Sequence, residues 1–566
     1  MSGDSKIPGA GGGAGLLEAI AKVALAYGTL LLVWAPALGS DRVNDSFQDW
    51  SYGAEYRSYA TTALFDFGEV PYFAWQGRHK GHRNVQFDAF FANPETPVFS
   101  PLLPLYRVLD HEEATRAERR IRLLVGTVGG YVLLSAWLTR VSLWALLAFC
   151  LLFFGNGAVA GHVLVGHGMA GALFAVPLAL GLFLRATQTV RERVLPPAAV
   201  GCGALLAVMA YDGASHFLTH FLLFLLVYSL IACAIDPSRT RATAVALLTS
   251  IASFLVLGAY KLLPMIDVYA GYAADYQMGY ASLQELLLQF RPFTPETGFE
   301  HELNSYVGIA GAALFAAALF RWTRTTVPFL LTGLLFLLLT WLPVASWLAQ
   351  NAPFFETQGV FSRFRVGFLF AFACLAAALL DRAMTTVRAW GPSGRRTAAW
   401  VLAGALLVGL AVDLHYQNFE RRREALLLDP YPPIAAARIA PLPFLPADGD
   451  VEIRPVRRGV NWAEYRYRSA GTGGSAGTIS SPVLEKGVGH LVFSGDVRVR
   501  EEADGPVFVL TRRNGSFRYE FRHRAATLGG WITTLALASA AVLGLRWLFR
   551  RVGASMPPGG SARTPR

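Results

Sequence analysis

Long apolar runs separated by short polar stretches dominate the hydrophobic pattern of this chain. Runs of roughly 17 to 25 apolar residues are long enough to cross the hydrocarbon core of a bilayer as α-helices. About twelve such runs are present, near residues 16–38, 121–139, 141–158, 168–185, 197–212, 216–235, 242–264, 304–321, 326–346, 364–382, 398–414 and 529–549. The pattern therefore predicts a mainly α, polytopic transmembrane helical bundle.

Two long polar segments interrupt this series, at residues 39–120 and 415–528. The first includes Trp50, Trp75 and many Phe and Tyr residues, and this is too aromatic for a disordered linker. Long loops usually carry function, so the segment predicts a folded lid or active-site loop. The second contains short runs with period-two alternation between Gly-rich turns, which predicts a connector and a small β-domain before the last span.

These segments divide the chain into predicted units. They are a tail at 1–15, a transmembrane domain at 16–414 that includes the outer loop 39–120, a connector with the β-domain at 415–528, a last span at 529–549 and a tail at 550–566. Both tails are rich in Gly, Pro and Ser, a composition typical of disorder.

Composition supports the membrane interpretation, since hydrophobic residues make up 54% and charged residues 16% of the chain. Arginines gather at one set of span ends: Arg185, Arg191, Arg193, Arg239, Arg241, Arg321, Arg324, Arg382, Arg388, Arg395, Arg396, Arg546, Arg550 and Arg551. The positive-inside rule makes that side cytoplasmic, and an even number of spans places both termini there. The segments 39–120 and 415–528 then face outward.

One group of arginines conflicts with this orientation. Arg116, Arg119, Arg120 and Arg122 lie on the predicted outer side before the second span. Long loops translocate largely regardless of charge, so the orientation is kept. The net charge of +11 is mostly the cytoplasmic arginine excess. It favours membrane lipid headgroups as partners and not nucleic acid.

Several sites can be excluded from the residue pattern. Cys150, Cys202, Cys233 and Cys374 all lie in apolar runs without metal-ligand spacing, which is typical of small core residues. His162 and His167 are five apart, so on one helix they would diverge, and no carboxylate is near in the sequence. No metal site is predicted there.

Asp212, His216 and His220 are interpreted as a structural polar cluster. No Walker A motif, dinucleotide loop or nucleophile elbow is placed where it would work, which disfavours ATP-driven transport and serine hydrolysis.

Three carboxylates follow the first span. Asp41, Asp45 and Asp49 are spaced four apart and would share one face if the helix continues. A carboxylate there could act as a general base on an acceptor hydroxyl, or help to hold a divalent cation such as Mg²⁺ or Mn²⁺. The alternative is a solvated cap where the helix leaves the membrane.

Basic residues occur at the predicted outer span ends, where Lys261 closes the seventh span and Arg363 and Arg365 open the tenth. Arginine forks suit phosphate oxygens. Two arginines at i and i+2 on a helix do not face one direction, so one of them could bind an anionic ligand while the other meets headgroups. Snorkelling at the interface is the alternative for each.

Short motifs along the chain resemble those of the GT-C superfamily of polytopic glycosyltransferases, in particular its YfhO-like branch. They are Asp45-Ser46-Phe47-Gln48, Gly68-Glu69-Val70-Pro71-Tyr72-Phe73-Ala74-Trp75, Asn93-Pro94, Phe99-Ser100-Pro101-Leu102, Gly166-His167-Gly168, Tyr260-Lys261-Leu262-Leu263-Pro264 and Ser362-Arg363-Phe364-Arg365. The order of these motifs and the β-domain before a last span are also similar, so the likeness covers nearly the whole chain.

The resemblance implies a transferase that moves a sugar from a polyprenyl-phosphate donor to a cell-envelope glycan or lipid acceptor. The reaction would occur on the outer face of a bacterial inner membrane, with inversion. Asp45 would be the general base, with Asp41 and Asp49 in reserve. Lys261 with Arg363 or Arg365 would bind the donor phosphate. Gln48, Trp75, Asn93 and His167 would contact the substrate.

Two other functions remain open from the sequence. One is a transporter or flippase for a lipid-linked saccharide, which should place charged groups or broken helices near mid-membrane. The other is a non-catalytic subunit of envelope assembly, whose loop carboxylates would point to bulk water. The candidate groups lie at outer span ends instead, which favours chemistry at the interface.

Overall fold

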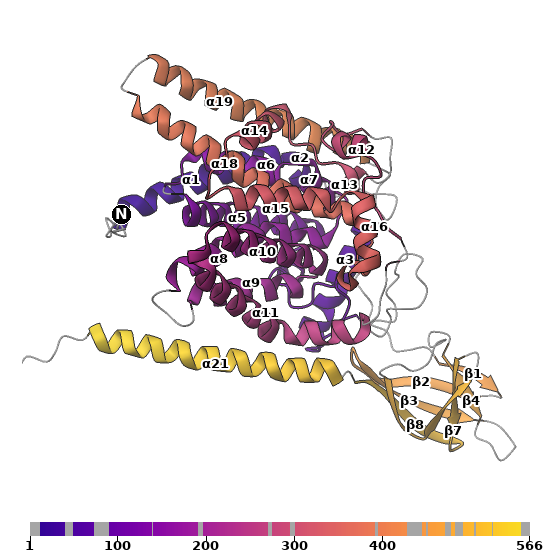
Figure 1. The fold of residues 1–566 in the computed structure, drawn as a ribbon. Coiled ribbons are helices and arrows are strands. Elements are labelled where there is room, and N and C mark those ends of the chain that lie inside the picture. Colours follow the sequence, from indigo (N-terminus) through magenta and orange to yellow (C-terminus); the bar gives the residue numbers. More distant parts are fainter. Residues whose placement is uncertain are drawn as a thin grey trace, which may run out of the picture.

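The protein folds as a helical bundle with a β-sandwich at one end (Figure 1). The computed structural model describes residues 12–39, 49–72, 90–138, 140–190, 196–269, 274, 276–294, 300–390, 394–426, 444–448, 451–469, 477–481, 491–502, 505–522 and 524–555. Of the predicted site residues, Asp41, Asp45, Gln48 and Trp75 lie outside these ranges.

The helices account for most of the described chain. The first part contains α1 (Gly12–Val33), α2 (Ala35–Gly39), α3 (Asp49–Thr61), η1 (Thr62–Asp66), α4 (Leu105–Val108), α5 (His111–Trp137), α6 (Leu143–Phe154), α7 (Gly157–Leu164), η2 (Gly168–Phe174), α8 (Val176–Thr189), α9 (Pro197–Tyr211) and α10 (Ser215–Ile235). The second part contains η3 (Pro237–Arg239), α11 (Thr240–Tyr269), α12 (Leu283–Leu288), α13 (Glu300–Leu303), α14 (Ile309–Phe320), α15 (Val327–Leu338), α16 (Leu342–Asn351), α17 (Pro353–Glu356), η4 (Phe361–Phe364), α18 (Arg365–Ala389), α19 (Gly394–Leu414), η5 (His415–Glu420), α20 (Arg421–Leu426) and α21 (Arg524–Ser555).

Seven described helical segments are long and apolar enough to cross a membrane, or eight if a bent pair counts as one span. The seven are Gly15–Val33, Gly168–Thr189, Ser215–Ile235, Pro237–Val268, Phe361–Ala389, Gly394–Arg423 and Arg524–Val542. The other predicted runs fall on that pair, on the shorter helices α9, α14 and α15, and on the second half of α5. The membrane character is therefore clear from the helices, and the count of twelve spans stays a prediction.

The bent pair is α6 and α7, which meet at an angle of 51°. Asn156 accounts for the break, because its side-chain oxygen accepts the Val159 N–H at 2.9 Å and caps α7. Its amide nitrogen donates to the carbonyls of Leu152 and Phe153, which end α6. One buried side chain thus satisfies backbone groups on both sides of the bend.

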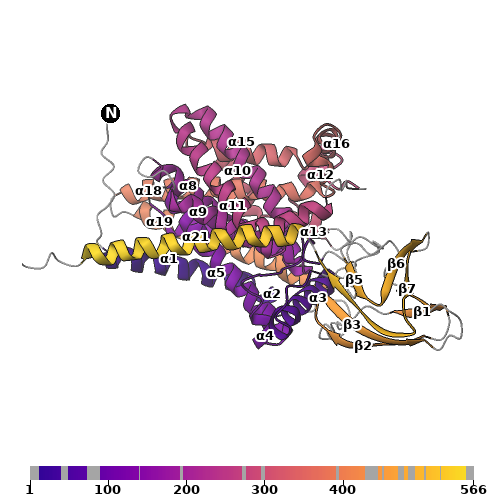
Figure 2. The same cartoon turned by 90° about the horizontal axis from the view of Figure 1, so that it is seen from below.

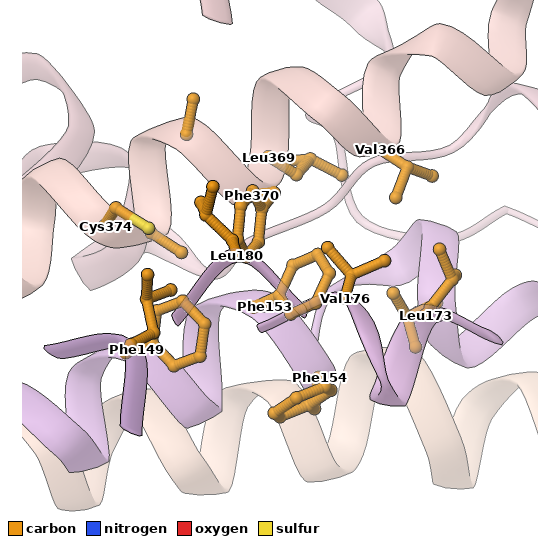
Figure 3. Packing of buried hydrophobic residues seen from close by; sticks show 14 of the residues in the cluster. Phe149, Phe153, Phe154, Leu173, Val176, Leu180, Val366, Leu369, Phe370 and Cys374 are labelled. Atoms are coloured by element: carbon orange, nitrogen blue, oxygen red, sulfur yellow. The ribbon is translucent and has the colours of Figure 1, made fainter. Parts of the chain in front are cut away.

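The core of the bundle is packed from aromatic and aliphatic side chains of α6, η2, α8 and α18 (Figure 3). The ring centroids of Phe153 and Phe370 lie 5.0 Å apart, and Phe154 stacks on Phe174 at 5.3 Å. Cys374 is buried among these residues, as predicted for a small core residue. Tight packing of this kind fixes the helix ends that carry the polar side chains described below.

A β-sandwich lies between α20 and α21. Its strands are β1 (Leu445–Asp448), β2 (Val451–Arg458), β3 (Trp462–Ser469), β4 (Thr478–Ser480), β5 (Leu491–Gly495), β6 (Val497–Glu502), β7 (Gly505–Leu510) and β8 (Asn514–Phe521). They form two antiparallel sheets, ordered β1-β4-β7-β6 and β2-β3-β8-β5. Alternate residues such as Tyr465, Phe508 and Phe517 fill the space between the sheets, which explains the period-two pattern of the sequence.

After β8 the chain enters α21, which runs back along the bundle in both views (Figures 1 and 2). This helix packs on α11, where the Thr533 hydroxyl accepts the Tyr260 N–H at 3.2 Å. The β-sandwich is thereby held at the end of the bundle where α11 ends and α18 begins. We call this the sandwich end of the bundle.

A second contact joins the sandwich to the loop after α3. The Glu69 carboxylate accepts the backbone N–H groups of Val460 and Asn461 at 3.0 and 3.3 Å and the indole N–H of Trp462 at 3.2 Å. The Asn461 side chain in turn accepts the Tyr72 N–H at 3.0 Å and donates to the Val70 carbonyl at 2.8 Å. The sandwich therefore braces the loop that follows α3.

Replacing Glu69 by glutamine should loosen this contact, because the amide cannot accept every N–H that the carboxylate accepts. Hydrogen bonds to charged groups contribute about 1.5–3 kcal/mol, so the backbone amides of Val460 and Asn461 should exchange about tenfold or more faster. Hydrogen–deuterium exchange of the full chain in detergent measures this. Glu464→Gln, in the same domain but outside this contact, is the matched control. Equal exchange in the two variants would contradict the bracing role.

Candidate functional site

Buried ionisable side chains gather at the sandwich end of the bundle. Those described as buried are Glu118, Arg119, His162, His167, Asp212, His220, Lys261, Glu302, Arg365 and Arg422. They come from the N-terminal half of α5, from α7 and the turn after it, from the ends of α9 and α11, from the starts of α10 and α18, and from α13 and α20. Burying ionisable groups is costly, so such a collection is a functional candidate.

The first cluster centres on Glu118 of α5. Its carboxylate accepts two hydrogen bonds from Arg57 of α3, at 3.0 and 3.2 Å, and one from Arg122 at 2.8 Å. The Tyr106 hydroxyl donates to the same carboxylate at 2.5 Å. Arg122 also forms an ion pair with Asp212 at 2.6 Å, which ties α5 to the end of α9. The cluster joins three helices that are distant in sequence.

Electrostatics keep Glu118 ionised. Burial alone would raise the pKa of this carboxyl group, but the positive charges of Arg57 and Arg122 outweigh burial and hold the pKa well below its ordinary value. A cavity of about 40 Å³ adjoins the cluster, lined in part by Arg57, Arg119, Arg122 and His167. It is large enough to hold water.

The arginines that conflicted with the orientation rule are explained by this cluster. Arg119 is buried and the Arg122 side chain is only 11% exposed, so neither lies at a membrane surface. Arg119 donates to the carbonyls of Ala37 and Val163. Arg116 pairs with Glu112 on the exposed face of α5. Three of the four arginines thus have partners within the protein, which counting charges in loops cannot reveal.

The second cluster centres on Glu302 of α13. Arg363 donates its Nε to both oxygens of this carboxylate at 3.1 Å and its Nη2 to one of them at 2.5 Å. Arg365 donates to the Glu302 backbone carbonyl and, at 3.0 Å, to that of Ser362. Burial would raise the pKa of the Glu302 carboxyl group, but the charge of Arg363 holds it well below its ordinary value. Arg363 and Arg365 therefore both bind Glu302, the first through its side chain and the second through its backbone carbonyl.

His162 and His167 belong to the same cluster, and the expectation that they diverge is wrong. The helix α7 ends at Leu164, and Gly166 takes φ of 87°, which turns the chain back. The two Nδ1 atoms lie 2.8 Å apart, and His162 Nε2 is 3.7 Å from Glu302. A carboxylate is therefore close, although it comes from a distant part of the chain.

Lys261 occupies a different position from the arginines. Its buried ammonium group donates to the carbonyls of Phe91, Asn93 and Thr96 at 2.6, 2.8 and 3.3 Å, and to the Thr96 hydroxyl at 3.0 Å. The side chain thereby fixes the 91–96 segment to α11. The structure thus brings Lys261 together with Asn93, and Arg363 and Arg365 together with His167 through Glu302. Whether any of them contacts a substrate stays a prediction.

The predicted carboxylates precede the first cluster along the chain. Asp49 is the first residue of α3, and its side chain is not among those described. At 1.5 Å of rise per residue, about 12 Å of helix separates its backbone from that of Arg57. Asp41 and Asp45 lie outside the described residues.

Sequence reasoning missed Arg57, Glu118 and Glu302 as members of the site. One signal was present for Glu118, because a carboxylate among the arginines just before an apolar span suggests internal pairing. Arg57 and Glu302 carried no comparable signal.

Comparison with known proteins leaves the family open. No protein-family model and no curated sequence matches the chain. Among solved structures, the chain is similar to ArnT from Cupriavidus metallidurans bound to undecaprenyl phosphate. The TM-score is 0.41 and the sequence identity 13%, over 73% of this chain and 77% of that chain. At this level the comparison assigns neither a family nor an activity.

Proposed function

We propose that this protein is a GT-C-type membrane glycosyltransferase of the bacterial inner membrane. It would transfer a sugar from a polyprenyl-phosphate donor to a cell-envelope glycan or lipid acceptor on the extracytoplasmic face. The proposal rests on the sequence motifs and on one structural observation. That observation is the surplus of buried positive charge at the sandwich end of the bundle.

Among the described side chains that are largely inaccessible to water at this end, basic ones outnumber carboxylates. In the first cluster Arg57 and Arg122 bind the Glu118 carboxylate, Arg122 also pairs with Asp212, and Arg119 donates to backbone carbonyls. In the second cluster Arg363 binds the Glu302 carboxylate, and Arg365 donates to the backbone carbonyl of the same residue. A surplus of guanidinium groups inside a membrane protein is costly unless an anion balances it, and arginine forks match phosphate oxygens. The phosphate of a lipid-linked donor is an anion that would approach these arginines from within the bilayer.

The position of the charges favours a transferase over a transporter. Among the described residues, the buried charged side chains lie at one end of the helices and not along a path between both ends. An alternating-access transporter needs a site that is reached from either side. Groups confined to one interface suit a reaction between a lipid-borne donor and an acceptor in the envelope.

The reaction would be a single displacement. Asp45 would take the proton of the acceptor hydroxyl, whose oxygen attacks the anomeric carbon as the bond from that carbon to the phosphate oxygen breaks. The phosphate leaves with the bonding electrons, and Arg363 and Arg365 stabilise its added negative charge. The anomeric centre inverts, unlike in a two-step retaining route. Gln48, Trp75, Asn93 and His167 stay the predicted substrate contacts, and Lys261 keeps a predicted role near the phosphate.

Sugar transfer in membranes supplied with radiolabelled polyprenyl-phosphate sugars tests this proposal. Label should reach a lipid or polymer acceptor with the wild-type protein, and Arg363→Ala should reduce transfer about 10²- to 10³-fold because one phosphate donor group is lost. Arg388→Ala, on the exposed end of α18 far from Glu302, is the matched control and should leave transfer unchanged. Folded wild-type protein that transfers no sugar from any donor would reject the function. Full transfer by Arg363→Ala would reject only this phosphate site.

A further inference from the structure

We infer that His162, His167 and Glu302 form a binding site for a divalent transition-metal ion of the zinc class. Each side chain offers one ligand atom, and these atoms all lie within 4.8 Å of one another. All three residues are buried, at 0%, 9% and 3% exposure. The inference concerns metal binding and does not depend on sugar transfer.

The spacing of the two imidazoles is close to that of a metal-bound pair. Two nitrogens at about 2.1 Å from one zinc ion in tetrahedral geometry are about 3.4 Å apart. The Nδ1 atoms of His162 and His167 are 2.8 Å apart. Moving the two rings apart by roughly half an ångström would therefore make room for an ion. Without an ion, one ring must donate a proton to the other. Binding would replace that shared proton, as metal binding to histidine commonly does.

Three separate parts of the chain build the site. His162 is on α7, His167 follows the turn at Gly166, and Glu302 is on α13, which packs against α7. The positive φ of Gly166 is what returns the second histidine to the first. A pair of buried histidines facing one another beside a buried carboxylate is a donor set that polar packing alone does not require.

The arginines around Glu302 are compatible with a metal ligand. Arg363 approaches both carboxylate oxygens, and an ionised carboxylate has about four acceptor positions, so an arginine and an ion can share it. Carboxylates that bind metals are commonly oriented by a second hydrogen-bonding group, and Arg363 fills this role. Arg365 fixes the backbone of the same residue through its carbonyl.

The donor set selects the class of ion. Two imidazole nitrogens and one carboxylate oxygen suit Zn²⁺ and neighbouring transition metals, whereas Mg²⁺ and Ca²⁺ prefer oxygen ligands throughout. Three protein ligands leave a fourth position of a tetrahedral ion open. Because Arg363 is also the proposed phosphate ligand, the ion would add positive charge beside the same phosphate.

The test is the metal content of the full-length protein. The protein is produced with added zinc, purified in detergent without chelator and analysed by mass spectrometry for metals. We expect about one zinc ion per chain in the wild type and at least a tenfold lower content in His167→Ala and in Glu302→Gln. His415→Ala, which removes a histidine outside the cluster, should keep the wild-type content. Full metal content in either ligand variant would overturn the site.

A second measurement guards against variants that fail to fold. Wild-type protein is stripped with a chelator, and zinc is titrated back in competition with a fluorescent indicator. His167→Gln, which keeps a polar side chain, is compared once its elution on size exclusion matches that of the wild type. Zinc should bind the stripped wild type and bind His167→Gln at least tenfold more weakly. If the stripped wild type binds no zinc, the inference is wrong, whatever the transfer assay shows.

Discussion

Replacing Asp45 by asparagine is expected to reduce sugar transfer by about 10²- to 10⁴-fold, the range typical of the loss of a general base. Asparagine has nearly the shape of aspartate but cannot accept the proton of the acceptor hydroxyl. The donor phosphate and the acceptor should still bind, so the loss should appear in the turnover rate and not in the KM for the donor. Transfer of radiolabelled sugar in membranes, measured over a range of donor concentrations, separates the two.

Asp41→Asn and Asp49→Asn are the matched controls for this prediction. They remove a carboxylate of the same segment and should leave the rate within a few-fold of wild type. If Asp45→Asn transfers sugar normally while one control variant does not, the base is the aspartate that was replaced in that control. If all three variants transfer normally, no carboxylate of this segment acts as the base, although the protein could still be a transferase.

Much of the fold can be predicted from the hydrophobic pattern, because the side chains that a helix or strand buries recur with the period of that element. Most of the longer helices of the bundle fall on the predicted apolar runs, and the strands β2, β3, β5 and β7 cover the alternating runs of the second polar segment. The break between α6 and α7 was not predicted. The apolar run continues on both sides of it, and only the short stretch Gly155-Asn156-Gly157 gives a local signal.

Less of the candidate site could be predicted from the sequence. Span ends placed Lys261, Arg363 and Arg365 at one end of the bundle, since the ends of successive spans alternate between the two sides. Their partners were not predicted, because Arg363 and Glu302 are 61 residues apart, as are Arg57 and Glu118. Pairing at such separations depends on how helices pack. The sequence pattern of one helix contains no information on its neighbours.

Glu118→Gln should destabilise the protein by about 3–5 kcal/mol, the usual cost of removing one partner from a buried ion pair. The glutamine would leave Arg57 without its charge partner and Arg122 with only Asp212, in a site where both side chains are almost inaccessible to water. Thermal unfolding of the purified full chain in detergent measures the change. The matched control is Glu112→Gln on the same helix. Its ion pair with Arg116 is exposed, so the loss should be less than about 1 kcal/mol.

Acid should remove the difference in unfolding temperature between the wild type and Glu118→Gln. The Glu118 carboxyl group has a folded pKa below its ordinary value of 4.5, so its charge stabilises the fold at neutral pH. As pH falls below that ordinary value, the unfolded chain takes up this proton first, and the advantage of the wild type shrinks until the folded carboxyl group is protonated too. The gap in unfolding temperature should therefore be widest near neutral pH and narrow steadily below about pH 4. A gap that stays constant into acid would mean that Glu118 acts through its shape and hydrogen bonds, and that its charge does not hold Arg57 and Arg122 in place.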